Sequence, residues 1–347
     1  MIPRTVEDLT PEWLSDALEE DVTAVSSTPL GVGAGLVGQL FKLDVTTAKG
    51  PKSVVAKLAA AGEESRFVAT ILNMYGREVG FYQELAHRTD ISKPRCYFCD
   101  HDPATQDTIL LLEDVSTRGR MLDQVAGCSA EEAEPAIRTL ARHHANFWDD
   151  ATLGEYSFLL RLCDEPYPGA VGMAYDGSWP RVQELFPDAI TPAVRKLGDN
   201  FSERIPALFA KLCTGPLVLA HADWRLDNLF FADDGDVIAV DWQLIDRSVG
   251  PRDLSYIVSQ SMNIEGRVDC ERAFDTYIDA LAANGVTADR DWAWEMFRYG
   301  TQFGFVYPVV AAGGLTVDDP RHLELTRAML DRSVAAIEAL DAFELAL

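Results

Sequence analysis

The chain has 347 residues, of which 48% are hydrophobic and 24% are charged, and this composition is typical of a globular protein. Asp and Glu total 55 against 30 Lys and Arg, which gives a formal net charge of −25. Such a charge repels nucleic acid and anionic lipid, so we expect neither nucleic acid nor membrane as a partner. The acidity indicates either general solubility, which is the simpler interpretation, or attraction of a cationic substrate.

A chain of this length is long for one core, so two domains or two lobes are expected. Its apolar runs fall short of the about 20 residues that cross a bilayer. The first residues, MIPRTVEDLTPEW, lack the apolar stretch of a signal peptide. We therefore expect a cytoplasmic protein, either a monomer or a homodimer.

Residues 1–115 are predicted to form a small, mostly β lobe. Thr10 and Pro11 fit the N-cap and the first position of a short helix. Hydrophobic periodicity then predicts antiparallel strands, a helical region and two further strands, in the segments 22–58, 63–88, around Cys96 and 108–115. The expected lobe therefore combines an antiparallel sheet with one main helix.

A glycine-rich turn and a strand lysine stand out in this lobe. The turn, residues 31–38, reads GVGAGLVG, and glycines such as Gly33 and Gly35 let a backbone approach phosphate oxygens closely. Glycines in a turn can equally serve its backbone angles alone. Lys57 lies in the apolar run VVAKL, and a buried lysine needs a carboxylate or phosphate partner. Glu78, on the apolar side of the next helical region, is the predicted partner; the alternative is that Lys57 reaches solvent.

Cys96 and Cys99 form a C-x-x-C pair with His101 just beyond. A zinc site would require a second pair of ligands at matching spacing, and none follows. We therefore interpret the pair as two small thiols on a strand, and we expect the six cysteines to be free, as is usual in a cytosolic chain.

Residues 116–347 are predicted to be mainly helical. Ser129 and Glu132 form a capping box in front of a helix. Residues 150–215 are rich in Pro, Gly and aromatic residues and are predicted to be an insertion of loops and short helices. A hairpin over 216–242 and further helices from Arg252 complete the chain, so the fold class is α+β.

The octapeptide HADWRLDN, residues 221–228, lies between two apolar runs of the predicted hairpin. In the catalytic loop of protein kinases the catalytic aspartate precedes a metal-binding asparagine by five positions, and Asp223 and Asn228 have this spacing. Arg225 stands where a cation can reach a phosphoryl group in transfer. Asp241 ends the next strand, VIAV, where a second metal-binding carboxylate is expected.

These residue types suit phosphoryl transfer. A carboxylate can accept or orient the proton of an attacking hydroxyl, and positive charge can stabilise the γ-phosphate. Mg²⁺ prefers carboxylate and amide oxygens. The octapeptide and Asp241 supply both kinds of oxygen.

The chain resembles the aminoglycoside phosphotransferase and choline kinase superfamily, whose bilobal fold resembles that of protein kinases. His221-Ala222-Asp223 stands where the family usually has His-Gly-Asp. DWQ at 241–243 and GPRDL at 250–254 match further family elements. Together with REVGFYQEL and HHANFW, they are closest to the ecdysteroid-kinase-like branch. The resemblance extends from the glycine turn to about residue 262.

The resemblance implies roles for individual residues. It implies ATP and Mg²⁺ as cofactors and a small hydroxylated molecule as the partner. The acidity of the chain would suit a cationic molecule. Asp223 is the implied base, and Asn228 and Asp241 are the implied metal ligands. Lys57 is the implied phosphate-binding lysine, with Glu78 as its partner. The implied hinge residues are Glu113 and Val115, and the implied phosphate-covering glycines are Gly33 and Gly35. Ala222 departs from the family's glycine and narrows the backbone angles available there.

Neighbouring residues have simpler interpretations. We expect His221 to shape the loop by hydrogen bonding, because Asp223 already fills the role of base. His144 is expected to be a core histidine, and Asp253 to cap its helix or brace the loop. Asp227 is either a solvated loop acid or a contact for a cationic substrate.

The sequence therefore predicts a kinase of a small molecule such as an aminoglycoside, an amino sugar, or a choline-like or steroid-like alcohol. A protein kinase is an alternative, although the stretch from Asp241 to Gly250 is short for an activation segment and no Ala-Pro-Glu follows. A catalytically inactive nucleotide-binding regulator and a metal-dependent hydrolase are further alternatives. A hydrolase would not account for the predicted pair of Lys57 and Glu78.

Overall fold

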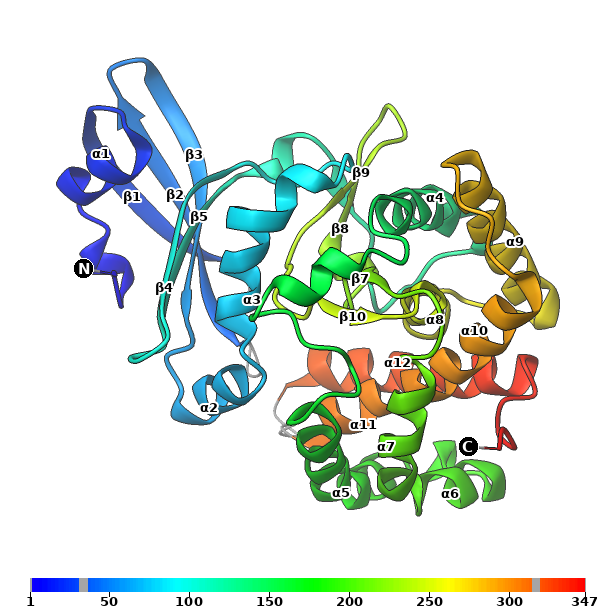
Figure 1. Ribbon diagram of the computed structural model, residues 1–347. Helices are drawn as coiled ribbons and strands as arrows, with labels where there is room; N and C mark the ends of the chain where they lie inside the picture. The colour runs from blue at the N-terminus through cyan, green and yellow to red at the C-terminus, as the bar shows by residue number, and fades with distance from the viewer. Residues whose placement is uncertain (1, 31–36, 314–318, 347) are drawn as a thin grey trace.

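The computed structural model describes residues 2–30, 37–313 and 319–346. A small lobe built on one antiparallel sheet lies beside a larger, mainly helical part (Figure 1). The predicted α+β class is confirmed.

The sheet of the small lobe has the strand order β1-β2-β3-β5-β4, and all neighbours are antiparallel. Its strands are β1 (Val22–Leu30), β2 (Gly38–Thr47), β3 (Gly50–Ala59), β4 (Cys96–Asp102) and β5 (Asp107–Glu113). Alternate residues of a strand point to opposite faces. Val54, Ala56 and Leu58 of β3 therefore pack in one core with α1 (Pro11–Leu18), and Lys57 points to the opposite face.

The predicted helical region 63–88 is present but divided. It consists of α2 (Glu63–Ile71), α3 (Met74–Gly80), a π-helical turn η2 (Phe81–Leu85) and a 3-10 turn η3 (Ala86–Arg88). Asn73, with φ of 50°, lies between α2 and α3 in the left-handed conformation that asparagine tolerates. This break lets α2 and α3 take different directions.

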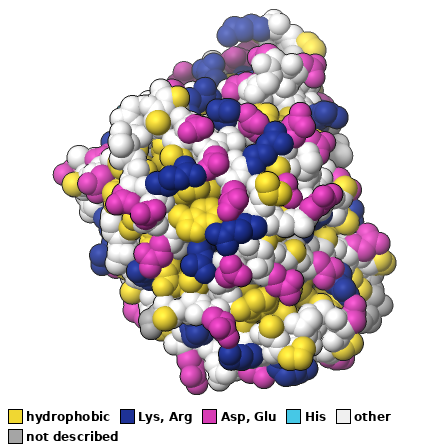
Figure 2. Space-filling model, turned by 90° about the vertical axis from the view of Figure 1, so that its right-hand side faces the viewer, with side chains coloured by type: hydrophobic (Ala, Val, Ile, Leu, Met, Phe, Trp, Pro, Cys, Tyr) yellow, Lys and Arg dark blue, Asp and Glu magenta, His cyan; other side chains and the backbone are white. Residues whose placement is uncertain are grey.

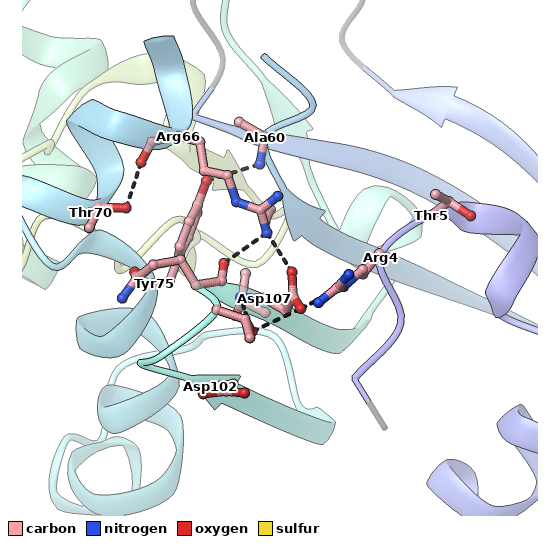
Figure 3. Close-up of polar contacts among 12 residues, drawn as sticks. Arg4, Thr5, Ala60, Arg66, Thr70, Tyr75, Asp102 and Asp107 are labelled. Carbon is pink, nitrogen blue, oxygen red and sulfur yellow. Dashed lines mark hydrogen bonds and ion pairs between the residues drawn. The ribbon is translucent and has the colours of Figure 1, made fainter. Parts of the chain in front are cut away.

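Asp107 fastens three segments of the small lobe together (Figure 3). Its Oδ1 accepts a hydrogen bond from Arg66 Nη2 of α2 at 2.6 Å, and its Oδ2 accepts one from Arg4 Nε at 2.7 Å. Nearby, the Tyr75 hydroxyl of α3 accepts a hydrogen bond from Ala60 N–H at 2.9 Å and donates one to the Val37 carbonyl at 2.8 Å. These contacts fix the ends of β2 and β3 close to Lys57.

Helices dominate the larger part. The first, α4 (Ala130–Asn146), begins at the predicted capping box of Ser129 and Glu132. The remaining helices are α5 (Tyr167–Leu185), α6 (Pro192–Gly198), α7 (Phe201–Lys211), α8 (Gly250–Gln260), α9 (Arg267–Ala283), α10 (Arg290–Gly304), α11 (Val306–Gly313) and α12 (Pro320–Ala339). Short 3-10 turns occur at η1 (Val6–Asp8), η4 (Val115–Thr117), η5 (Ala151–Glu155), η6 (Pro187–Ala189) and η7 (Leu226–Asn228).

The region 150–215 is more regular than predicted, because α5 alone has 19 residues. Its Pro and Gly content favoured loops, but Tyr175, Trp179 and Val182 recur at helical spacing and are all buried. Packing of α5 against α7 and α11 outweighs the weak local propensity of the segment.

Short strands frame the octapeptide. In the predicted hairpin, β8 (Leu229–Phe231) does pair with β9 (Val237–Ala239), and β8 also pairs with β6 (Arg120–Met121). However, β7 (Val218–Ala220) pairs with the later strand β10 (Asp246–Ser248). The chain that enters the octapeptide and the chain that follows Asp241 are therefore held side by side.

The main hydrophobic core joins the helices of the larger part with a segment from the small lobe. Phe81, Leu85 and Ile91 are buried in this core. The Phe81 ring stacks on the buried Trp242 ring with centroids 3.9 Å apart. The end of α3 is thus anchored on the helical part, although it precedes β4 and β5 in sequence.

The surface on the side of α4 and α9 carries charged and apolar groups together. Figure 2 shows acidic and basic side chains interspersed there around apolar groups. An open groove of about 530 Å³ on this side lies between Pro135 of α4 and Ala283 of α9. Among the residues that the structure describes, no helix is both long and apolar enough to cross a bilayer.

Candidate active site

Lys57 lies at the centre of a buried ion cluster between the sheet and α3. Its Nζ is 2.6 Å from Glu78 Oε2 and 2.6 Å from Asp241 Oδ1, and Lys57 is 7% exposed. Burial disfavours the charged ammonium, but the carboxylates of Asp241 and Glu78 outweigh burial and raise the pKa of Lys57. The predicted contact with Glu78 is confirmed, whereas the direct contact with Asp241 was not predicted.

The octapeptide forms a tight loop that Asp253 holds in place. The backbone N–H groups of His221 and Ala222 donate to the two carboxylate oxygens of Asp253, at 2.6 and 2.9 Å. Ala222 has φ of 66°, a left-handed conformation in which a Cβ costs energy. The position where the family usually has glycine therefore still adopts a glycine-like conformation.

His221 has a structural role, as expected. Its Nδ1 accepts a hydrogen bond from Asp223 N–H, so the proton resides on Nε2, which donates to the Val240 carbonyl at 3.0 Å. Burial lowers the pKa of His221 although the carboxylate of Asp253 opposes this. The neutral ring thus connects the octapeptide to the residue that precedes Asp241.

His144 is a core residue, as expected. Its Nδ1 is 2.8 Å from the Tyr277 hydroxyl and its Nε2 is 3.3 Å from Asp253 Oδ2. Gly250, at the start of α8, packs so closely here that a Cβ would lie 2.3 Å from the Tyr277 hydroxyl. The glycine of the GPRDL element therefore permits α8 to bring Asp253 beneath the loop.

Asp223 is held from two sides. Its Oδ2 accepts a hydrogen bond from Asn228 Nδ2 at 2.7 Å, and its Oδ1 accepts one from Arg225 Nε at 3.1 Å. The Val240 N–H donates to the Asn228 carbonyl at 3.0 Å, which places Asp241, the next residue, beside this group. The structure thus brings together the predicted base, both predicted metal ligands and the predicted cation.

Arg225 also binds Asp227, since its Nη1 is 2.9 Å from Asp227 Oδ2. Burial opposes the charge of the guanidinium, but the carboxylates of Asp223 and Asp227 around it raise the pKa of Arg225. Burial raises the pKa of Asp227 despite this cation. Asp227 is therefore engaged within the loop rather than freely solvated.

The oxygens available for a cation are those of Asn228 and Asp241. Because Asn228 Nδ2 donates to Asp223, its Oδ1 is the atom left to face a metal. Asp241 Oδ2 accepts from Gln243 Nε2 at 3.2 Å. Across residues 2–30, 37–313 and 319–346, no three His, Cys, Asp or Glu side chains form a metal-binding group. The donor set fits Mg²⁺, which often takes one or two protein ligands and completes its shell with phosphate and water.

The predicted hinge lies at the end of β5. The Glu113 N–H already donates to the Arg95 carbonyl at 2.8 Å, so of the two backbone groups of Glu113 only the carbonyl is left for adenine. Asp114 caps the η4 turn that begins at Val115. Burial disfavours the charge of Asp114, but hydrogen bonds from Ser116 and Ser53 outweigh it and lower the pKa to about 2. Gly33 and Gly35, predicted to cover the phosphates, lie outside the described residues.

Sequence reasoning did not assign roles to Gln243, Tyr256 and Arg77. The DWQ motif contains Gln243, and this motif could have drawn attention to it. Tyr256 follows Asp253 by one helical turn, a spacing that puts both on the loop side of α8. Burial, with the nearby Asp223 carboxylate, raises the pKa of Tyr256 well above its ordinary value, so its hydroxyl keeps its proton.

Arg77 precedes Glu78 in α3 and reaches the helical part. Its Nη1 donates to the Tyr167 hydroxyl at 2.5 Å and to the Ile245 carbonyl at 3.3 Å. Arg77 is fully buried. Only the three-dimensional contact reveals this role, since nothing in the sequence near Arg77 indicates a partner about 90 residues away.

Comparisons with known proteins agree with this geometry. Residues 33–147 and 169–286 match the model of the ecdysteroid kinase-like family. A search of the curated proteins gave no match.

Among solved structures, a protein from Ralstonia eutropha JMP134 assigned as an aminoglycoside phosphotransferase has 18% identity and a TM-score of 0.58, covering 98% of this chain and 99% of its own. An amicoumacin kinase in complex with AMP-PNP and Ca²⁺ has 14% identity and a TM-score of 0.58, covering 95% and 94%. Choline kinase from Cryptosporidium parvum Iowa II has 11% identity and a TM-score of 0.56, covering 91% and 90%.

At such identities these likenesses show the fold, and the predicted two-lobed fold of the small-molecule kinases is confirmed. The family model matches more than half of the residues, including those from Lys57 to Glu78 and the whole of the octapeptide. The chain belongs to the ecdysteroid kinase-like family.

Proposed function

We propose that the protein is an ATP- and Mg²⁺-dependent phosphotransferase that phosphorylates a hydroxyl of a small molecule. The observation that carries the proposal is the convergence of Lys57 from β3 with Asp241, which lies next to the group formed by Asp223 and Asn228. These side chains are far apart in sequence. Phosphoryl transfer requires such a meeting of a phosphate-binding cation, metal-binding oxygens and a base.

In the proposed reaction Asp223 receives the proton of the acceptor hydroxyl. The hydrogen bonds from Asn228 and Arg225 keep this carboxylate oriented, so little reorganisation is needed when the hydroxyl binds. Arg225 can then offset negative charge on the phosphoryl group in transfer. Mg²⁺, held by Asn228 and Asp241, would neutralise charge on the β- and γ-phosphates.

The Lys57–Asp241 contact has to change when nucleotide binds. Both oxygens of Asp241 are engaged, one by Lys57 and one by Gln243, and a metal would compete for them. Phosphate oxygens offer Lys57 a replacement partner, while Glu78 can keep its own contact with Lys57. Nucleotide and metal are therefore proposed to bind together, with the phosphates taking Lys57 and the metal taking Asp241.

The acceptor is proposed to bind on the C-terminal side of the cleft, next to Asp223. Tyr256 lies beside Asp223, and its ring centroid is 4.2 Å from that of Tyr307 in α11. The region 150–215, with α5 to α7, is the proposed acceptor-binding insertion of the larger lobe, which we place at residues 116–347. Aminoglycosides, amino sugars, choline-like amines and steroid-like alcohols are the candidates.

A panel of hydroxylated acceptors screened for ADP release, with and without Mg²⁺, tests this function. Asp223→Asn should lower turnover of any acceptor found by about 10²–10⁴-fold and leave ATP binding intact. Asp233→Asn, an exposed change in the turn between β8 and β9, is the comparison variant and should retain most activity. ATP binding without turnover of any acceptor would instead identify a nucleotide-binding regulator.

A further inference from the structure

The region that contains α5 to α7 begins and ends on the same strand. On the entry side, Arg247 N–H of β10 donates to the Leu160 carbonyl at 2.9 Å, and Leu162 N–H donates to the Arg247 carbonyl at 3.3 Å. On the exit side, Val249 N–H donates to the Leu212 carbonyl at 3.0 Å. The two ends of the region are therefore neighbours, held by β10 and by the residue that follows it.

A cysteine follows immediately at each end. Cys163 comes after Leu162, and Cys213 comes after Leu212. The Cys213 thiol donates to the Arg247 carbonyl with an Sγ···O distance of 3.9 Å, and the same oxygen accepts the Leu162 N–H. The two thiols lie close to each other, and both are free and half-buried.

We propose that Cys163 and Cys213 form a redox modification site that closes to a disulfide in the presence of a peroxide. The Cys163 thiolate attacks one peroxide oxygen, which breaks the O–O bond, releases water and leaves a sulfenic acid. The Cys213 sulfur then attacks the Cys163 sulfur, and the S–S bond forms as a second water leaves. Two thiols and one hydrogen peroxide thus give one disulfide and two waters.

The surroundings give the two thiols different roles. Burial, and then the contact with Cys163, raise the pKa of the Cys213 thiol. A thiol of raised pKa is a poor first nucleophile. The Cys213 thiol is also held by the Arg247 carbonyl, so we assign Cys213 as the resolving partner and Cys163 as the residue that meets the oxidant.

Cys96 and Cys99 make a second close pair but are less suited to a bridge. They lie three residues apart on β4, with an irregularity of the ladder between Cys96 and Phe98. Three residues of strand span up to about 10 Å between Cα atoms, which is longer than an unstrained disulfide allows. Cys163 and Cys213 come from different segments, so their bridge does not require stretching of one strand.

A disulfide between Cys163 and Cys213 would close a loop around α5, α6 and α7. Cross-linking of a long loop restricts the unfolded chain and stabilises the folded state. The oxidised protein should therefore resist unfolding of this region. This effect does not depend on phosphoryl transfer, so the proposal can fail or succeed independently of the proposed function.

The test is a peptide map of the full chain after exposure to a small excess of hydrogen peroxide. Free thiols are alkylated in denaturant and the protein is digested with trypsin. Cleavage after Arg161, Arg181, Lys211 and Arg225 leaves peptides 162–181 and 212–225, each with a single cysteine. We expect these two peptides to be joined, with a mass lower than their sum by two hydrogen atoms, and to separate on reduction.

Two variants assign the roles. In Cys213→Ser, Cys163 should stop at the sulfenic acid, which dimedone traps, whereas Cys163→Ser should leave Cys213 reduced. Cys99→Ser is the matched control and should form the 163–213 link as the wild type does. Oxidation should also raise the thermal unfolding midpoint by several degrees in the wild type and in the control only.

Sulfinic acid on Cys163 with Cys213 still reduced would overturn the proposal. It would also be overturned if both thiols remain alkylatable after peroxide has oxidised Cys96 or Cys99. The wild-type map needs no substitution, so it stays decisive even if a variant folds poorly.

Discussion

Two buried carboxylates close to the cleft, Asp253 and Glu78, are used in opposite ways. Both oxygens of Asp253 accept hydrogen bonds, from His221 and Ala222 N–H and from His144. Glu78 uses one oxygen for Lys57, while its Oε1 is buried and has no hydrogen-bond partner among the described residues. Buried polar groups in folded proteins are generally satisfied. Asp253 is therefore fully hydrogen-bonded within the fold, whereas Glu78 has Lys57 as its side-chain partner.

The pKa directions agree with this difference. Burial opposes the charge of Asp253, but the hydrogen bond and charge of His144 outweigh it and lower the pKa. Burial raises the pKa of Glu78 even though Lys57 opposes the shift. A fully bonded carboxylate is stabilised in its charged form, and a partly bonded one is not. Asp253 and Glu78 are thus distinguished by their hydrogen bonds rather than by their burial.

The largest expected effect is that of Asp253→Ala. It leaves two buried N–H groups of the octapeptide without an acceptor, so we expect the free energy of unfolding to fall by about 3–5 kcal/mol. Urea titration followed by circular dichroism measures this loss. Asp176→Ala, on an exposed position of α5, is the control and should change stability by less than about 0.5 kcal/mol.

Glu78→Gln should affect ATP binding more than stability. The amide oxygen of the new side chain still accepts from Lys57, which also retains Asp241, so the free energy of unfolding should change by less than about 1 kcal/mol. Loss of the charge that holds Lys57 should weaken ATP binding about tenfold, measured by calorimetry. Glu84→Gln, an exposed change six residues further on, should alter neither quantity. A destabilisation equal to that of Asp253→Ala would abolish the distinction between the two acids.

Asp114 should behave like Asp253 on a smaller scale. It accepts hydrogen bonds from Ser53 and from Ser116 N–H, at 2.7 and 3.0 Å, and its pKa is lowered from 3.8 to about 2. Its stabilising contribution is therefore complete above pH 3.8 and is lost as the pH falls through about 2.

Asp114→Asn should accordingly lower the free energy of unfolding by about 1 kcal/mol at pH 7, and the difference from wild type should shrink below pH 3.8. Urea titrations at several pH values measure this. Asp44→Asn, an exposed change on β2, supplies the reference. A wild-type advantage that is independent of pH would show that the charge of Asp114 contributes nothing.

The smallest expected effect concerns the backbone that Asp253 holds. Ala222 has φ of 66°, and glycine adopts this conformation without the penalty of a Cβ. Ala222→Gly should therefore raise the free energy of unfolding by about 0.5 kcal/mol, the relief of strain less the added entropy of the unfolded chain. Ala220→Gly, two residues earlier in β7, should lower it by about 0.5–1 kcal/mol. Equal losses in both variants would mean that Ala222 is not strained.

Much of this site could be predicted from local sequence spacing. The five-residue interval from Asp223 to Asn228 and the place of Asp241 at a strand end were enough to predict one cluster. Glu78 was assigned as the partner of Lys57 from the helical period alone, and the structure has that contact. Such inferences succeed because strand alternation and helix periodicity fix the direction of side chains within one element.

Contacts between distant elements could not be predicted in this way. The pairing of β7 with β10, the Lys57–Asp241 contact and the reach of Arg77 to Tyr167 all depend on how elements pack in three dimensions. The length of α5 was likewise missed, because packing against other helices outweighs its Gly and Pro residues. Tertiary interactions, rather than local propensity, determine these features.

The anchoring of α3 on the helical part determines where the molecule can flex. Arg77 ties this helix to Tyr167 and Ile245, and the stacked rings of Phe81 and Trp242 extend the attachment. A motion of the helical part would therefore carry α3 with it, and Tyr75 of α3, which is hydrogen-bonded to Ala60 and Val37, would transmit the motion to the ends of β2 and β3. Lys57 of β3 contacts both Glu78 of α3 and Asp241, so nucleotide entry at this ion cluster would act on the sheet and on the helical part together.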